Sequence, residues 1–71
     1  MPQVDLIAYA NIQQDMSEGE VLARLGPPDY KSGSAHVCRW YWLSEAGDLQ
    51  QITVLVEFWN GRVHSKERTI S

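Results

Sequence analysis

The sequence predicts a single α+β domain, in which one or two short N-terminal helices pack on a three-stranded antiparallel β-meander. Two observations carry this prediction: a capped helical segment at residues 16–26, and an Asn60-Gly61 pair between two segments of alternating hydrophobicity. A chain of 71 residues makes one domain, residues 1–71. A chain this short buries only about 60% of the surface that its unfolded form exposes. The core must therefore be compact and rich in large side chains.

Residues 4–12 fit two kinds of element. Alternation of apolar residues from Val4 to Ile12 suits a strand, whereas Val4, Ile7 and Asn11 fit one stripe of a helix. Periodicity alone does not separate these two in a short apolar run. We favour a short helix, because neither Gly nor Pro interrupts the segment.

The next segment carries the signals of a helix at both ends. Ser17 precedes Glu20 by three positions, which is the spacing of a capping box. Gly26 is placed to end the helix in a left-handed conformation, and Pro27 and Pro28 prevent its continuation. The apolar stripe that we expect to be buried consists of Val21, Leu22 and Leu25.

Three strands are predicted downstream of this helix. Residues 30–35 are polar and Gly-containing and are expected to form a loop, and residues 45–48 have the composition of a turn. The strands occupy residues 37–43, 51–59 and 62–70. Asn60-Gly61 is the preferred sequence for a two-residue hairpin turn.

That turn predicts the register of the last hairpin. It pairs Trp59 with Arg62, Phe58 with Val63, Glu57 with His64 and Leu55 with Lys66. The face that covers the helices then carries Ile52, Val54, Val56, Phe58, Val63 and Ser65, and the opposite face carries Thr53, Leu55, Glu57, Trp59, Arg62, His64, Lys66 and Arg68. In the strand at 37–43 we expect Cys38, Trp40 and Trp42 to face inward, and Arg39, Tyr41 and Leu43 to face outward.

Composition excludes several functional classes. Six basic and nine acidic residues give a net charge of −3, which argues against a nucleic-acid-binding protein. The single cysteine, Cys38, forms no internal disulfide and no Cys-based zinc site. No apolar run approaches the roughly 20 residues of a membrane span. We expect no metal and no cofactor.

No catalytic constellation is evident, so we predict that the protein is not an enzyme. A nucleophile–base pair built from Cys38 and His36 or His64 is formally conceivable. However, Cys38 alternates with two Trp residues and is better explained as a small core residue. His64 is explained by a cross-strand pair with Glu57.

A basic and aromatic stripe on the outer face of the predicted sheet is the best candidate for a binding site. An ordinary solvated sheet face explains it equally well. Trp, Tyr and Arg are enriched at binding hot spots, and basic groups beside aromatic rings also suit anionic lipid head groups. The candidate interaction residues are Tyr41, Trp59, Arg62, His64, Lys66 and Arg68.

The segment at residues 16–29, with Met16-Ser17 and Leu25-Gly26-Pro27-Pro28, resembles the signature of the SmpA/OmlA (BamE-like) family. The aromatic run Trp40-Tyr41-Trp42 and the later strand ending in Phe58 match that family's pattern. The resemblance covers roughly residues 12–66. Asp15 stands where the family usually has Gly, and the sequence shows no lipobox, so Cys38 is not a lipid anchor.

The resemblance implies a fold shared with β-lactamase-inhibitor-like repeats and a role in the bacterial envelope. Family members are outer-membrane lipoproteins that support the assembly of β-barrel proteins, and they contact partner proteins and anionic lipid. We therefore expect a non-enzymatic scaffold module in the periplasm or at the outer-membrane periphery, or in the cytoplasm if no leader precedes the domain. The alternative is a protein inhibitor of a hydrolase. Unpaired strand edges also suggest a homodimer or a domain swap.

Overall fold

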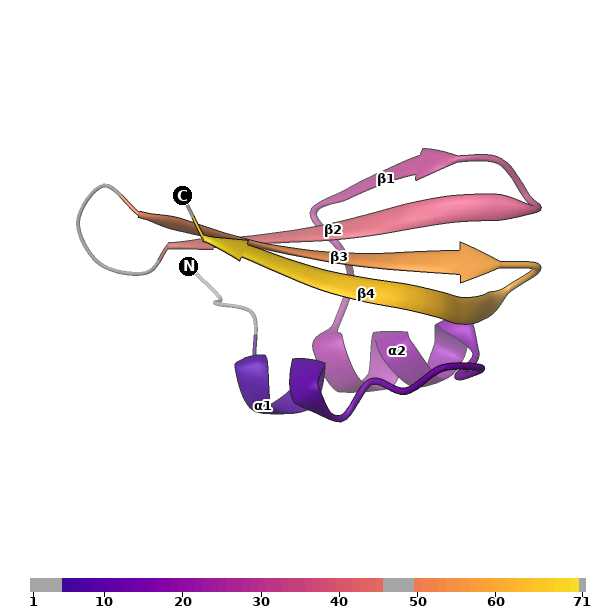
Figure 1. Cartoon of the computed structure of the whole chain (residues 1–71), viewed down its shortest axis with the longest axis horizontal. Helices are drawn as coiled ribbons and strands as arrows, with labels where there is room; N and C mark the ends of the chain where they lie inside the picture. The colour runs from indigo at the N-terminus through magenta and orange to yellow at the C-terminus, as the bar shows by residue number, and fades with distance from the viewer. Residues whose placement is uncertain (1–4, 46–49, 71) are drawn as a thin grey trace.

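The protein is an antiparallel sheet with two short helices packed on one face (Figure 1). A computed structural model describes residues 5–45 and 50–70. The elements in chain order are α1 (Leu6–Ala10), α2 (Glu18–Leu25), β1 (Tyr30–Gly33), β2 (Val37–Glu45), β3 (Gln51–Trp59) and β4 (Arg62–Ile70). The strands follow one another in the order β1-β2-β3-β4. The α+β class is confirmed.

The prediction of a three-stranded meander is wrong, because residues 30–33 form a fourth strand rather than a loop. Tyr30 pairs with Tyr41 and Gly33 pairs with Cys38. The backbone N–H of Asp29 donates to the carbonyl of Tyr41, and its carboxylate accepts from the N–H of Leu43. These contacts extend the attachment of β1 to β2 beyond the strand itself. Most of the turn predicted at residues 45–48 lies outside the described residues.

The helix favoured at the N-terminus is present as α1. The Asp5 carboxylate caps it by accepting from the backbone N–H groups of Ile7 and Ala8. The predicted capping box of α2 is also present: the Ser17 hydroxyl accepts from the N–H of Glu20, and the Glu20 carboxylate accepts from the N–H of Ser17. The helix ends at Gly26, whose φ is 77°.

The connection between the helices is bonded to the edge of β4. The N–H of Asp15 donates to the carbonyl of Val63 at 2.9 Å, and the N–H of Val63 donates to the carbonyl of Met16 at 2.8 Å. Asp15 has a φ of 72°, in the left-handed region that favours glycine. The turn therefore holds the start of α2 against β4.

The core lies between the helices and the sheet. Its buried members are Ile12, Val21, Trp40, Trp42, Ile52, Val54, Val56, Phe58 and Val63. The inward orientation predicted for Trp40 and Trp42 is confirmed, and Cys38 packs against this cluster as a half-buried residue. The Trp42 indole N–H donates to the carbonyl of Gly26, which fixes the end of α2 to the sheet. Leu22, which we expected to be buried, is 42% exposed.

A β-bulge changes the register of the last hairpin. Trp59 pairs with Arg62 and Phe58 pairs with Val63, as the turn predicts, but Glu57 then pairs with Ser65 instead of His64. The extra residue in β4 shifts every later pair, so that Val56 lies opposite Lys66 and Val54 lies opposite Arg68. Ser65 is therefore outward-facing, whereas Lys66 and Arg68 lie on the face that carries the helices.

Candidate functional site: the open face of the sheet

The sheet face opposite α1 and α2 carries a group of partly exposed aromatic, aliphatic and charged side chains. We call it the outer face. Alternation with the buried residues of β2 and β3, together with the strand pairing, assigns to it Tyr30, Arg39, Tyr41, Leu43, Leu55, Glu57 and Trp59. Tyr30 is 61% exposed, Trp59 47% and Leu43 41%. Neither helix covers this face (Figure 1).

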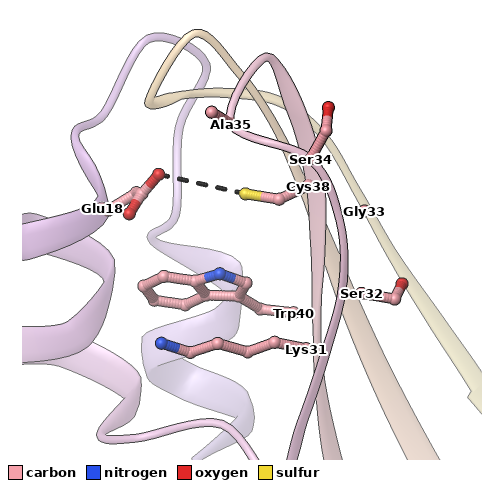
Figure 2. Close-up of a pocket in the computed structure, with 8 residues that line it drawn as sticks. All are labelled: Glu18, Lys31, Ser32, Gly33, Ser34, Ala35, Cys38 and Trp40. Atoms are coloured by element: carbon pink, nitrogen blue, oxygen red, sulfur yellow. Dashed lines mark hydrogen bonds between the residues drawn. The ribbon is translucent and has the colours of Figure 1, made fainter.

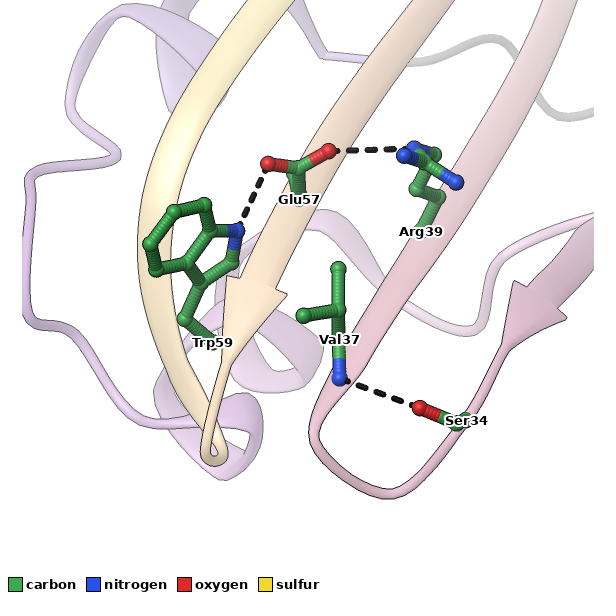
Figure 3. A network of polar contacts seen from close by, with 5 residues as sticks. All are labelled: Ser34, Val37, Arg39, Glu57 and Trp59. Atoms are coloured by element: carbon green, nitrogen blue, oxygen red, sulfur yellow. Dashed lines mark hydrogen bonds and ion pairs between the residues drawn. The ribbon is translucent and has the colours of Figure 1, made fainter.

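Glu57 links two neighbouring side chains on the outer face. Its carboxylate accepts from the indole N–H of Trp59 at 2.7 Å and from Nε of Arg39 at 3.0 Å (Figure 3). The hydrogen bond from Trp59, supported by Arg39, lowers the pKa of Glu57 because both contacts favour the ionised carboxylate. The network fixes the orientation of the Trp59 indole on the outer face.

Two ring pairs flank this network. The Trp59 and His64 rings stack with their centroids 3.7 Å apart and their planes at 10°. On the neighbouring strands, the Tyr30 and Tyr41 rings are tilted at 44° with centroids 5.4 Å apart. Ordered aromatic side chains offer large contact areas and lose little side-chain freedom on binding. The outer face is thus suited to binding a complementary surface.

The basic stripe predicted on this face is not formed. Lys66 lies on the opposite face, where its ammonium donates to the carbonyls of Tyr9 and Ala10 and lies 4.6 Å from the Tyr9 ring. Arg68 is placed on that face as well, by its pairing with Val54. The Arg62 guanidinium donates to the carbonyl of Asp15 at the sheet edge.

Among the six candidate residues, the Trp59 and His64 rings stack, and Trp59 also pairs with Arg62 across the hairpin. Tyr41 shares the face of Trp59 but contacts Tyr30, a residue in the segment for which the sequence predicts a loop. The alternation of residues in β2 predicts that Arg39 lies on the outer face. Its contact with Glu57 depends on the register between β2 and β3, which the sequence does not determine because the loop between these strands is longer than a two-residue turn. Tyr30 lies in the polar, Gly-containing segment Tyr-Lys-Ser-Gly, which gives little strand signal.

The groups considered for catalysis make other contacts. The Cys38 thiol lies 3.9 Å from a carboxylate oxygen of Glu18. Burial, and then the charge of Glu18, raise the pKa of this thiol, which disfavours the thiolate that a nucleophile requires. His36 contacts the side-chain oxygen of Asn60 at 3.3 Å. No group of three or more potential metal ligands occurs within residues 5–45 and 50–70.

Comparisons of the chain with known protein families, with curated proteins and with solved structures gave no match. Within the part of the chain that the structure describes, no helix is long and apolar enough to cross a membrane.

Proposed function

We propose that the protein is a non-enzymatic binding module that engages a partner protein through the outer face. The observation that carries this proposal is the Arg39–Glu57–Trp59 network, which orders an exposed indole beside further exposed side chains. A preorganised aromatic anchor with neighbouring apolar groups has the composition of a binding hot spot. The raised pKa of Cys38 favours a binding role over nucleophilic catalysis.

A protein partner fits this face better than an anionic lipid surface. With Lys66 and Arg68 on the helix-bearing face, the cations near the outer face are Arg39, which is paired with Glu57, and Arg62, which is bonded to Asp15. An anionic lipid surface attracts clusters of unpaired basic side chains. The outer face also carries Glu67, which pairs with the outward-facing Leu55, so its charge disfavours an anionic surface. The exposed Tyr30, Leu43 and Trp59 are the aromatic and apolar groups that suit the core of a protein–protein interface.

We further propose that the module acts in the bacterial envelope, as the SmpA/OmlA-like signature implies. The conformation of Asp15 supports this. The family usually has Gly at this position, and here Asp15 adopts a φ of 72°, which Gly accommodates without strain and Asp tolerates. The departure from the signature is therefore compatible with the same entry turn into α2.

Site-specific photo-crosslinking in the host cell tests this function. A photoreactive phenylalanine analogue replaces Leu43 on the outer face in one variant and Leu22 on α2 in the other, which leaves Trp59 in place. These two positions are 41% and 42% exposed. We expect a discrete crosslinked protein from position 43 only, and a partner from the envelope assembly machinery supports the proposed role.

Two results of this experiment would contradict the proposal. Crosslinks from position 22 alone would move the binding surface to the helices. An outer-face crosslink to a hydrolase, with loss of that enzyme's activity on binding, would replace the scaffold role with inhibition.

A further inference from the structure

The outer edge of β1 presents unpaired backbone groups. In the turn between β1 and β2, the N–H of Ser34 donates to the carbonyl of Val37 at 2.8 Å, so this pair is hydrogen-bonded. Pairs in an antiparallel ladder alternate between bonded and non-bonded. The next non-bonded pairs are Gly33 with Cys38 and Lys31 with Trp40. The N–H and C=O groups of Lys31 and Gly33 therefore point away from β2.

No strand lies beyond β1 in the sheet that residues 5–45 and 50–70 form. The other edge strand, β4, is different in two ways. Its outward groups at Val63 are already bonded to Asp15 and Met16. It also carries Lys66, Glu67 and Arg68 in succession, whereas β1 carries one charged side chain, Lys31, and charged side chains on an edge discourage strand addition. Strand addition is therefore favoured at β1 over β4.

A hollow of about 340 Å³ adjoins the edge of β1, between this strand and the first turn of α2 (Figure 2). Its lining includes Glu18, Lys31, Gly33, Cys38 and Trp40. Trp40 supplies an apolar wall of this hollow. A side chain of an added strand opposite Gly33 would project on the same side of the sheet as Cys38 and Trp40.

Two charged side chains line this hollow, Glu18 and Lys31. One carboxylate oxygen of Glu18 accepts from the Cys38 thiol at 3.9 Å. The ammonium of Lys31 lies over the Trp40 ring, 4.5 Å from its centroid, and in Figure 2 the indole is drawn between this ammonium and the Glu18 carboxylate. A basic side chain entering beside Gly33 would meet Glu18, and the net charge of −3 favours its approach.

We propose that β1 binds an extended segment of a protein, which adds a strand at Lys31 and Gly33 and places a Lys or Arg side chain in the hollow against Glu18. Main-chain bonds supply affinity and the side-chain pocket supplies specificity in this mode of recognition. β1 has only four residues, so the pocket must contribute a large share of the binding energy. This site is separate from the outer face and does not depend on the function proposed for it.

Short β-forming peptides with blocked termini and with Lys, Ala or Glu at the central position are the probes. Binding is followed by NMR on the isotopically labelled full chain. We expect the Lys-centred peptides to bind most tightly and to slow amide hydrogen exchange at Lys31 and Gly33. The Glu18→Gln variant is expected to reduce the preference for Lys over Ala by roughly tenfold, the scale of one charge-assisted contact.

Two proline variants form a matched pair. Lys31→Pro removes an outward N–H without breaking a bond to β2, and it should abolish binding. Arg68→Pro changes the corresponding outward position on β4, since Val54–Arg68 is also a non-bonded pair by the same alternation, and it should leave binding intact. Circular dichroism establishes whether each variant is folded. If Lys31→Pro does not fold, Glu18→Gln still tests the proposal, because this substitution does not change the backbone of the sheet.

Three results with the peptides would overturn the proposal. These are the absence of binding by every peptide, equal binding of Lys- and Glu-centred peptides, and chemical-shift changes at Trp59 and Tyr41 instead of at Lys31 and Gly33. Concentration-dependent protection of Lys31 and Gly33 without peptide would also overturn it, because the edge would then pair with a second copy of the chain.

Discussion

The indole nitrogen of Trp59 lies 2.7 Å from a carboxylate oxygen of Glu57, and this contact joins two residues of the same strand across the outer face. The other carboxylate oxygen contacts Arg39 on β2. The largest exposed aromatic ring of the sheet is thus tied to an ion pair between strands. This attachment orients Trp59 for binding through the outer face.

Removing the indole donor should raise the pKa of Glu57. Trp59→Phe keeps an aromatic ring beside His64 but removes the N–H that is the largest cause of the lowered pKa. NMR titration of the Glu57 carboxyl carbon in both proteins measures the change. An unchanged pKa in Trp59→Phe would show that the hydrogen bond does not form in solution.

The same contact makes stability depend on pH in acid. The folded-state pKa of Glu57 is lowered below the unfolded value of about 4.3. The ionised Glu57 carboxylate therefore contributes to the free energy of unfolding above that pH, and this contribution is lost as the pH falls through the folded-state pKa. Glu57→Gln should remove this part of the pH dependence, and we expect a contribution below about 1 kcal/mol because the Arg39 partner is half-exposed. Urea unfolding at a series of pH values measures it.

Lys66 should hold α1 on the sheet. Its ammonium donates to the carbonyls of Tyr9 and Ala10 at 2.9 and 3.2 Å, and α1 itself contains no buried residue. Lys66→Met should cost about 1–2 kcal/mol, the scale of hydrogen bonds to a charged group, and should speed amide exchange in Leu6–Ala10. Arg68→Met, on the same strand and face, is the control. Equal effects of the two substitutions would contradict this role.

The left-handed conformation of Asp15 gives a prediction about stability. Asp15→Gly relieves the cost of its φ of 72° and should be neutral or slightly stabilising. Asp15→Val should be destabilised relative to Asp15→Gly by about 1–2 kcal/mol. Both variants can form the backbone hydrogen bond from residue 15 to β4. The difference in their thermal stability therefore measures the cost of a positive φ at this position. Similar stability of both variants would contradict the observed φ.

Two glycines should respond in opposite directions to substitution by alanine. A Cβ on Gly33 would meet the Val37 carbonyl oxygen and lie 2.9 Å from the Cα of Cys38, and its φ is 103°. Gly33→Ala should therefore cost about 2 kcal/mol or more. In α2, a Cβ on Gly19 would lie 3.9 Å from the Ser17 hydroxyl oxygen, which is an ordinary contact distance, so Gly19→Ala should gain up to about 1 kcal/mol. Chemical denaturation of both variants tests this contrast.

Local sequence signals predicted the elements that depend on local interactions. Ser17 and Glu20 form the capping box because both groups lie within one turn of chain. Asn60-Gly61 closes the last hairpin because both residues adopt positive φ, which this turn requires. The inward set of β3 follows from its strict alternation.

The errors arose where the apolar pattern ends. In β4, Val63 is the only buried apolar residue, so nothing after it opposes a shift of one residue, and the bulge places Lys66 and Arg68 on the helix-bearing face. β1 was missed because Ser32 and Gly33 have low strand propensity, and because its pairing with β2 is a tertiary contact. The prediction that Lys66 and Arg68 lie beside Trp59 in a basic stripe was therefore wrong, whereas the predicted position of Trp59 on the outer face was correct.

The affinity of the crosslinked partner for two matched variants tests most directly whether the outer face is the binding surface. Leu43 on the outer face is 41% exposed and Leu22 on α2 is 42% exposed, so a change to Asp adds the same charge at equal exposure. We predict that Leu43→Asp weakens binding at least about tenfold, equivalent to about 1.4 kcal/mol, and that Leu22→Asp binds as the wild type does. Loss of binding in Leu22→Asp with normal binding in Leu43→Asp would contradict the assignment of function to the outer face.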